Sequence, residues 1–214
     1  LTDSTIRLPD LAKRCAQRGQ AAVALTDPTN LFGLVKFYKE AEGKGVKPVA
    51  GAQLTLDDGE SVLGRVSAWC LDERGYLSLS RLITRAYADG QRGDVLGVRP
   101  EWLFEDHAGL IVALGPDSPL GLAIAGGRDD HAAALLDHYT ARFDDRLYIE
   151  LQRVGKAGEE AFNRAALEMA AARGLPAIAT NAVRFLDRDD FDAHEARVCI
   201  ATGRVLDDPK RPRD

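Results

Sequence analysis

Polar residues that could do chemistry follow short apolar runs at several points in this chain. The run at 21–25 ends in Thr26 and Asp27, and Pro28 then turns the chain. If the runs are buried parallel strands, their carboxyl ends should meet along one edge, where α/β folds place their active sites. The residues expected at such ends are Asp27, Gln53, Asp117, Glu150, Gln152, Arg153, Thr180 and Asn181. The sequence therefore predicts a polar pocket.

Histidines suited to metal binding are scarce in this pattern. None of them follows an apolar run; the four are His107, His131, His138 and His194. His131 and His138 are seven residues apart on a predicted helix, so two turns separate them and one metal ion could not bind both. Asp192 precedes His194 by two residues, a spacing seen at some metal sites. Helix capping by Asp189 and Asp190 beside a surface or partly buried histidine explains the same residues and is favoured.

Other catalytic patterns are missing from the sequence. It has no GxSxG nucleophile elbow and no Walker phosphate loop. Cys15, Cys70 and Cys199 form no CxxC pair, so neither a disulfide framework nor a structural zinc site is indicated. Reduced thiols of this kind favour a cytoplasmic protein.

Composition limits the classes of partner. The chain has 214 residues and a net charge of −5, which gives it no general attraction for a phosphate backbone. The local exception is Lys210–Arg213, where a solvated tail is favoured over contact with DNA or a polymerase body. No apolar stretch is long enough to span a bilayer, so no membrane partner is expected.

Hydrophobic periodicity predicts helices that alternate with short apolar strands. Strands that are apolar on both faces indicate a covered parallel sheet, and hence an α/β fold, either a closed barrel or an open doubly wound sheet. No linker divides the chain, so a single domain over 1–214 is predicted. Helices are predicted over 8–19, 31–45, 74–90, 99–107, 128–143, 158–174 and 187–203, and strands over 21–27, 46–56, 61–72, 109–115, 146–152 and 175–181, with a loop at 91–100.

Several stretches together resemble one family. ALTDPTNLFGLVKFYKEAEGKGVKPVAGAQLTL, RGYLSLSRLITRAY, ARGLPAIATNAVRF, DFDAHEARVCIATG and LDDPKRPRD are similar to the PHP (polymerase and histidinol phosphatase) domain that opens the bacterial replicative DNA polymerase III alpha subunit. The resemblance covers essentially the whole chain. It implies a distorted (β/α)7 barrel, which is a TIM-barrel-like α/β fold of the PHP type. It also implies that the chain is truncated at both ends relative to the parent subunit.

Active members of the PHP family bind a metal cluster through His, Asp and Glu, and the resemblance implies where those ligands would fall. Asp3 matches a ligand that is kept, and an opening His-x-His would precede Leu1. Arg184 would bring a fixed positive charge, which repels divalent cations and could pair with Asp3 or Asp27 instead. Taken together, the former pocket comprises Asp3, Asp27, Pro28, Gln53, Val154, Asn181, Ala182 and Arg184, with Pro28, Gln53, Val154, Ala182 and Arg184 in place of ligands.

The resemblance implies a domain with no catalytic residues and no cofactor of its own, although a residual divalent metal stays open. It would support the rest of the alpha subunit, dock the proofreading exonuclease subunit, and meet DNA only through the parent polymerase. An active metal-dependent phosphoesterase or 3′–5′ exonuclease is the alternative, and it would need compensating ligands such as His194. An unrelated barrel enzyme for a small molecule is a third reading, which the length of the resemblance disfavours.

Overall fold

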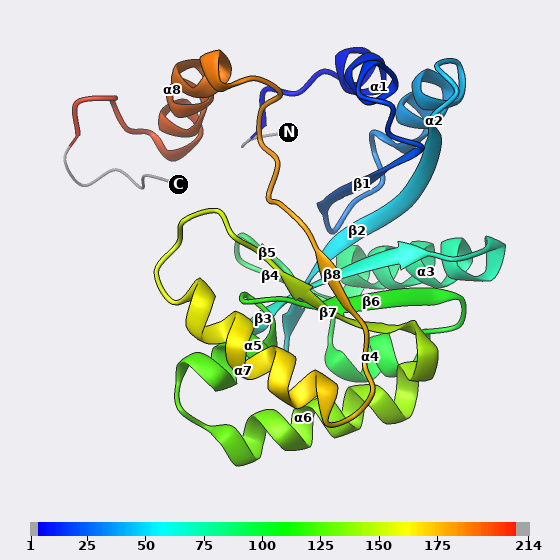
Figure 1. The fold of residues 1–214 in the computed structure, drawn as a ribbon, viewed down its shortest axis with the longest axis vertical. Helices are drawn as coiled ribbons and strands as arrows, with labels where there is room; N and C mark the ends of the chain where they lie inside the picture. Colours follow the sequence, from blue (N-terminus) through cyan, green and yellow to red (C-terminus); the bar gives the residue numbers. More distant parts are fainter. Residues whose placement is uncertain (1–3, 209–214) are drawn as a thin grey trace. The chain divides into compact units, whose positions relative to one another are not determined.

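A computed structural model describes residues 4–208 (Figure 1). Its main element is a six-stranded sheet in the order β1-β2-β3-β6-β7-β8. The α/β class predicted from the sequence is confirmed. The strands are β1 (Ala22–Pro28), β2 (Lys47–Asp57), β3 (Val62–Cys70), β6 (Leu110–Leu114), β7 (Leu147–Leu151) and β8 (Ala177–Ala179).

The sheet is mixed, so the prediction of a wholly parallel sheet was wrong. β3 pairs antiparallel with both β2 and β6, whereas β6, β7 and β8 run parallel. The reason is local, because the turn 58–61 joins β2 directly to β3 in a hairpin. Within that turn, Asp58 accepts hydrogen bonds from the amide of Glu60 at 2.9 Å and from the amide of Ser61 at 2.7 Å. An aspartate that binds backbone amides in this way stabilises a tight turn.

Helices occupy most of the positions that the periodicity predicts. An additional helix, α5, begins at Pro119 behind the cap Ser118, whose hydroxyl accepts from the amide of Gly121. The predicted loop at 91–100 instead contains a small hairpin of β4 (Gln91–Arg92) and β5 (Val95–Leu96). The helices are α1 (Leu8–Gln17), α2 (Leu34–Glu42), α3 (Glu73–Asp89), α4 (Pro100–Glu105), α5 (Pro119–Ala125), α6 (Asp129–Phe143), α7 (Glu159–Ala171) and α8 (Phe191–Thr202), with 3₁₀ turns at Asp144–Arg146 and Arg188–Asp190.

The described residues form two compact units. The terminal unit contains those within 1–23, 35–48 and 182–214, and the sheet unit contains 24–34 and 49–181. In the terminal unit, distant segments meet because the amide of Thr5 donates to the carbonyl of Arg184 (3.1 Å) and Arg14 pairs with Asp187. A single domain over 1–214 stays a prediction.

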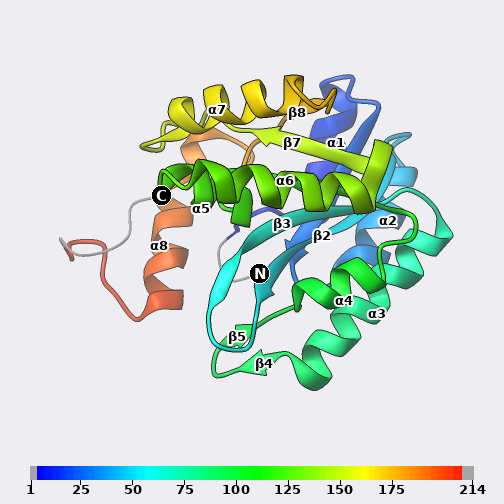
Figure 2. The same cartoon turned by 90° about the horizontal axis from the view of Figure 1, so that it is seen from below.

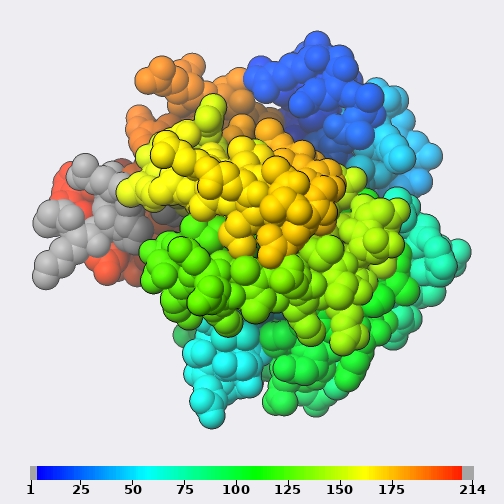
Figure 3. Space-filling view, turned by 60° about the horizontal axis from the view of Figure 1, so that its bottom comes forward, coloured from blue at the N-terminus to red at the C-terminus, as the bar shows by residue number. Residues whose placement is uncertain are grey.

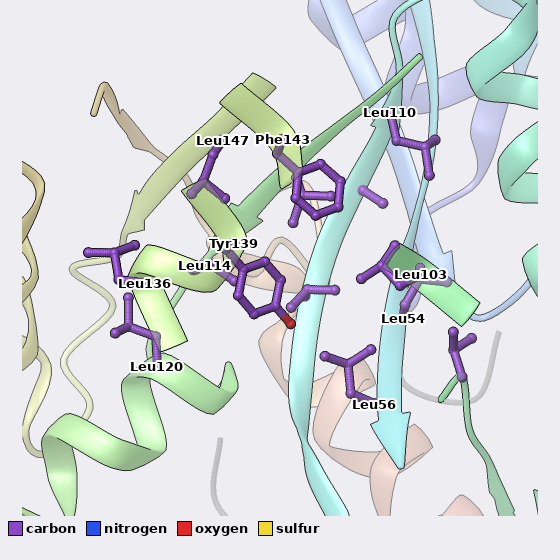
Figure 4. Close-up of a cluster of buried hydrophobic side chains, with 14 of the residues drawn as sticks. Leu54, Leu56, Leu103, Leu110, Leu114, Leu120, Leu136, Tyr139, Phe143 and Leu147 are labelled. Atoms are coloured by element: carbon purple, nitrogen blue, oxygen red, sulfur yellow. The ribbon is translucent and has the colours of Figure 1, made fainter. Parts of the chain in front are cut away.

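The sheet unit has an apolar face and a polar face, because successive side chains of a strand point to opposite sides. On the apolar face the strand residues are fully or almost fully buried and join one core with the helices (Figure 4). The strand residues of that core are Ala52, Leu54, Leu56, Val66, Ala68, Leu110, Val112, Leu114, Leu147 and Ile149.

Helices α3, α5, α6 and α7 pack against the strands of the sheet unit (Figure 2). α3 approaches closely at Gly75, where an added Cβ would lie 2.0 Å from the carbonyl oxygen of Gly109. Figure 3 looks onto the outer surfaces of α7 (yellow) and α6 (green to yellow-green). Over residues 4–208, no helix combines the length and apolar character that crossing a bilayer requires.

Candidate functional site

The polar face of the sheet carries the candidate site. Strand register places Gln53 of β2 opposite Ser67 of β3, Ser67 opposite Ala113 of β6, and Ala113 opposite Tyr148 of β7. Residues paired in this way share one face, and Glu150 lies two residues beyond Tyr148 on that face. Hydroxyl, amide and carboxyl groups from three of these strands therefore line the side of the sheet opposite the core.

Glu150 is the buried centre of this face, with 8% of the residue exposed. The hydroxyl of Thr180 donates to Oε1 (2.6 Å), the amide of Gln152 donates to the same oxygen (3.2 Å), and the hydroxyl of Ser67 donates to Oε2 (3.1 Å). Gly115 leaves room for the carboxyl group, because a Cβ there would lie 3.1 Å from Oε2. Each of the three donors is uncharged, so these bonds satisfy the carboxylate without a cation.

The structure brings together only some of the predicted strand-end residues. Glu150, Gln152 and Thr180 meet as the sequence led us to expect, although Thr180 lies just past β8. Ser67 was missed, since it lies inside β3 rather than at its end. The hairpin register that pairs it with Gln53 is the signal that would have found it.

Asp27 and Pro28 lie where predicted, at the end of β1, with Asp27 half-buried and Pro28 exposed. Gln53 was expected at a strand end but lies in the middle of β2, which continues to Asp57. The residue after Pro28, Thr29, is buried and has a positive φ of 44°. Its amide donates to the carbonyl of Gln53 (2.9 Å), so a strained turn fastens the end of β1 to β2.

The loop after β7 is closed by a carboxylate. Glu159, with 7% of the residue exposed, accepts hydrogen bonds from the amides of Val154, Gly155 and Lys156, the shortest at 2.9 Å. Two adjacent glutamates at the start of a helix would ordinarily be predicted to be solvated, but only Glu160 is exposed, where it pairs with Arg153. Val154 is itself exposed (42%), so the position where the resemblance places a histidine presents an aliphatic side chain to solvent.

The remaining predicted residues leave the sheet unit or the described part of the chain. Asn181 is exposed and ends the sheet unit, whereas Ala182 and Arg184 belong to the terminal unit. Asp3 lies outside the described residues. An ion pair of Arg184 with Asp3 or Asp27 therefore stays a prediction.

Three of the four histidines pack against aromatic rings. His138 lies edge-on to Phe104 (4.5 Å between ring centroids), and His194 is buried (2% exposed), its ring centroid 5.5 Å from that of Phe185. The expectation of a surface or partly buried His194 was therefore wrong. Burial lowers the pKa of His107 below its ordinary value, helped by the nearby charges of Arg146 and Arg142.

The capping assignment before α8 was also only partly right. Asp187 and Asp190 exchange side-chain and backbone hydrogen bonds in a capping box around the 3₁₀ turn Arg188–Asp190. Asp189 takes no part in that box.

Within the described residues, the polar face does not offer the ligands of a PHP-type metal cluster. Among residues 4–208, no three His, Cys, Asp or Glu side chains lie together in a way that could hold a metal ion. Hydroxyl and amide groups surround Glu150 in place of imidazoles and further carboxylates, and they are weak ligands for zinc, manganese or iron.

Comparisons with known proteins identify the family of this chain. The sequence model of the PHP domain matches residues 1–154. Over its whole length the chain is 45% identical to the DNA polymerase III subunit alpha of Xylella fastidiosa, 41% to that of Pseudomonas aeruginosa and 40% to that of Escherichia coli K12. It spans 18–19% of the length of these relatives.

Solved structures support the fold. An amidohydrolase from Chromobacterium violaceum aligns with 91% of this chain and 93% of its own (TM-score 0.54, 16% identity). A two-domain protein from Bacteroides vulgatus, described as containing a predicted PHP-like metal-dependent phosphoesterase, aligns with 91% of this chain and 52% of its own (TM-score 0.54, 14% identity). These likenesses match a distorted TIM-like α/β fold. The match of the PHP family model over residues 1–154, more than half of the chain, shows that the chain belongs to the PHP domain family.

Proposed function

We propose that this chain is the PHP domain of a DNA polymerase III alpha subunit and that it has no phosphoesterase activity. Its roles are to support the rest of the alpha subunit and to dock the proofreading exonuclease subunit during replication in the cytoplasm. DNA is met through the parent polymerase. The similarity to alpha subunits along the whole chain supports the assignment to this subunit.

The main support for the absence of phosphoesterase activity is the hydrogen bonding of Glu150. A metal-dependent phosphoesterase needs carboxylates and imidazoles with free lone pairs directed at a shared ion. Here the buried carboxylate accepts from Ser67, Gln152 and Thr180, and among residues 4–208 no two further His, Cys, Asp or Glu side chains join it in a group that could hold an ion. Gln53 is a neutral amide, and Val154 offers no ligand atom.

The direct test is metal-dependent hydrolysis by the complete alpha subunit. We expect no release of nitrophenol from bis-p-nitrophenyl phosphate and no 3′–5′ digestion of single-stranded DNA with added zinc, manganese or magnesium. Elemental analysis of the same preparation separates a residual metal ion from an active cluster. Turnover that disappears in Glu150→Gln would refute the proposal and restore the phosphoesterase alternative, which the fold likeness to a predicted phosphoesterase favours.

Docking is tested separately by binding the exonuclease subunit to the complete alpha subunit. We expect complex formation at low and at moderate salt. Loss of the complex at both would argue against docking while leaving the absence of phosphoesterase activity untouched.

A further inference from the structure

We infer that one face of α3 is the surface on which the remainder of the alpha-subunit polypeptide packs. This inference rests on the proposed function, since it takes the chain to be part of a polypeptide of the relatives' length. We call this face the α3 stripe. It comprises Tyr76, Leu77, Ser80, Thr84 and Tyr87 of α3, with Phe32 beside them.

The α3 stripe follows from helical spacing. Tyr76, Ser80, Thr84 and Tyr87 are separated by four, four and three residues, so they lie on one side of the helix. At the rise of an α-helix, this row is about 16 Å long. Leu77 widens the row toward its start. The opposite side of α3 is buried in the core of the sheet unit through Leu79, Leu82, Ile83 and Ala86.

The stripe carries no charged side chain, and its large side chains are exposed. Tyr76, Leu77 and Tyr87 have 44–47% of their surface exposed. Thr84 donates its hydroxyl to the carbonyl of Ser80 at 2.8 Å. A hydroxyl bonded back to its own helix in this way offers little polarity to a partner. Four large side chains half in water amount to roughly a few hundred Å², the size of patch that usually has a function on a monomer.

Phe32 extends the stripe from another segment of the sheet unit. It is 72% exposed, and its ring centroid lies 6.3 Å from that of Tyr87. The turn before it is fixed by Asn30, whose side chain accepts from the amide of Phe32 (3.1 Å) and donates to the carbonyl of Pro28 (2.9 Å). An ordered turn therefore presents this aromatic ring to solvent.

Three arginines of α3 border the stripe, and each is paired within the sheet unit. Arg74 pairs with Asp72, Arg81 with Asp106, and Arg85 with Glu105. The guanidinium of Arg85 also lies over the ring of Trp102 at 4.3 Å. A partner with its own charged patch would have to disrupt these pairs. The border instead suits a partner whose contacting surface is apolar and uncharged.

The uncharged character of the stripe favours a permanent partner over an exchanging one. Obligate interfaces resemble a domain core and are more apolar than interfaces that form and dissociate. The relatives are about five times as long as this chain, which matches only 18–19% of them. A tethered partner acts at a high effective concentration, so the remainder of the same polypeptide is the occupant that fits best.

Hydroxyl-radical footprinting of the complete alpha subunit, purified without other subunits, tests this inference. We expect Tyr76, Tyr87 and Phe32 to be labelled at least about tenfold more slowly than their exposure in the sheet unit predicts, because interface cores exclude water as protein interiors do. Leu122 of α5 and Leu167 of α7 are 44% and 41% exposed and serve as internal references, after correction for residue reactivity. Labelling of the stripe at the reference rate would overturn the inference.

The exonuclease subunit is the other possible partner of the stripe, and repeating the footprinting with that subunit added tells the two partners apart. If the stripe is labelled freely in the alpha subunit alone and becomes protected only with the exonuclease, the surface belongs to that subunit and the inference is wrong. Protection in the alpha subunit alone supports it, whether or not the exonuclease binds elsewhere. Failure of the inference is thus separate from failure of the docking proposed above.

A matched pair of variants gives an independent readout. Tyr87→Glu should leave the core of the sheet unit intact but place a charge in the interface, so that tryptic cleavage of the complete alpha subunit accelerates about tenfold. Leu167→Glu introduces the same charge at a site of similar exposure on α7 and should leave cleavage unchanged. Equal cleavage of the two variants would contradict the inference.

Discussion

The two faces of the central sheet are built from alternate residues of the same strands, yet they are stabilised in different ways. On one face Leu54, Leu114 and Ile149 are fully buried among helices. On the other, Ser67, Gln152 and Thr180 surround one carboxylate. The first face depends on excluded water and packing volume, and the second on satisfied hydrogen bonds. Substitutions should therefore fail for different reasons on the two faces.

The largest expected effect is on the apolar face. Leu114 has no exposed surface. Leu114→Ala leaves a cavity among rigid neighbours, so the free energy of unfolding should fall by about 2–5 kcal/mol. Ile111→Ala, in the same strand but on the opposite face and half-buried, should cost clearly less. Urea unfolding of the two variants measures the difference, and equal losses would mean that both faces are packed cores and that the comparison fails.

The next effect is on the polar face. Glu150 is the shared acceptor for Ser67, Gln152 and Thr180. Glu150→Ala leaves these donors without their acceptor, which should cost about 2–3 kcal/mol in urea unfolding. Glu150→Gln keeps a side-chain oxygen that can accept, so we expect it to cost less than the alanine variant.

Glu160→Ala is the matched control for the polar face. It removes an exposed carboxylate of the same type that pairs only at the surface, with Arg153. The free energy of unfolding should change by less than about 0.5 kcal/mol. If Glu150→Ala instead raised the free energy of unfolding, the buried carboxylate would be destabilising. That result is expected of a residue kept for metal binding or catalysis.

A smaller effect separates the donors of this face. Ser67 donates one hydrogen bond to Glu150. Ser67→Ala removes that bond without creating a large cavity, so the expected loss is about 1 kcal/mol. Ser61→Ala removes an exposed hydroxyl that hydrogen bonds to Asp58 in the turn, and its loss should be close to zero. Thermal unfolding measures the difference in stability between the two variants. If Ser67→Ala is as stable as Ser61→Ala, the hydrogen bond from Ser67 to Glu150 does not contribute to stability.

The difference between the faces also explains which parts of the fold the sequence could predict. Runs such as GLIVALG identify β6 as a strand, but an apolar run does not reveal the direction of its neighbours. The antiparallel pairs of β3 were therefore missed. Helix α5 has only seven residues, too few for its periodicity to stand out beside the cap at Ser118.

The candidate site was predictable only where it follows the strand-end rule. Glu150, Gln152 and Thr180 lie near or just past the ends of β7 and β8 and were found, but Ser67 lies inside β3 and depends on strand register. Glu159 looked solvated because it begins a helix beside another acidic residue, and its three amide donors come from the loop fold. Such tertiary contacts are invisible to local patterns.

The carboxylate of Asp57, at the end of β2, adds a pH-dependent contribution to stability that can be compared with that of Glu150. The bulge between Leu56 and Asp57 interrupts the alternation of the strand. The Asp57 carboxylate is buried and accepts from Arg92 of the β4–β5 hairpin and, at 2.7 Å, from the amide of Gly59. The hydrogen bond from Arg92, with help from that amide, holds the pKa of Asp57 below its ordinary value. Unlike the carboxylate of Glu150, this one depends on a cation.

A lowered pKa in the folded protein fixes the sign of the pH dependence. The stabilisation by Asp57 is fully present above the ordinary aspartate pKa, near 4, and is lost as pH falls through the lower pKa of the folded state. Asp57→Asn should therefore be less stable than the parent at about pH 6, and the two should converge at acid pH. Denaturant unfolding at several pH values measures this, with Asp137→Asn, a carboxylate exposed on α6, as the control. A constant difference between parent and variant across pH would show that Asp57 contributes through packing and not through its charge, because only an ionised carboxylate gains from Arg92.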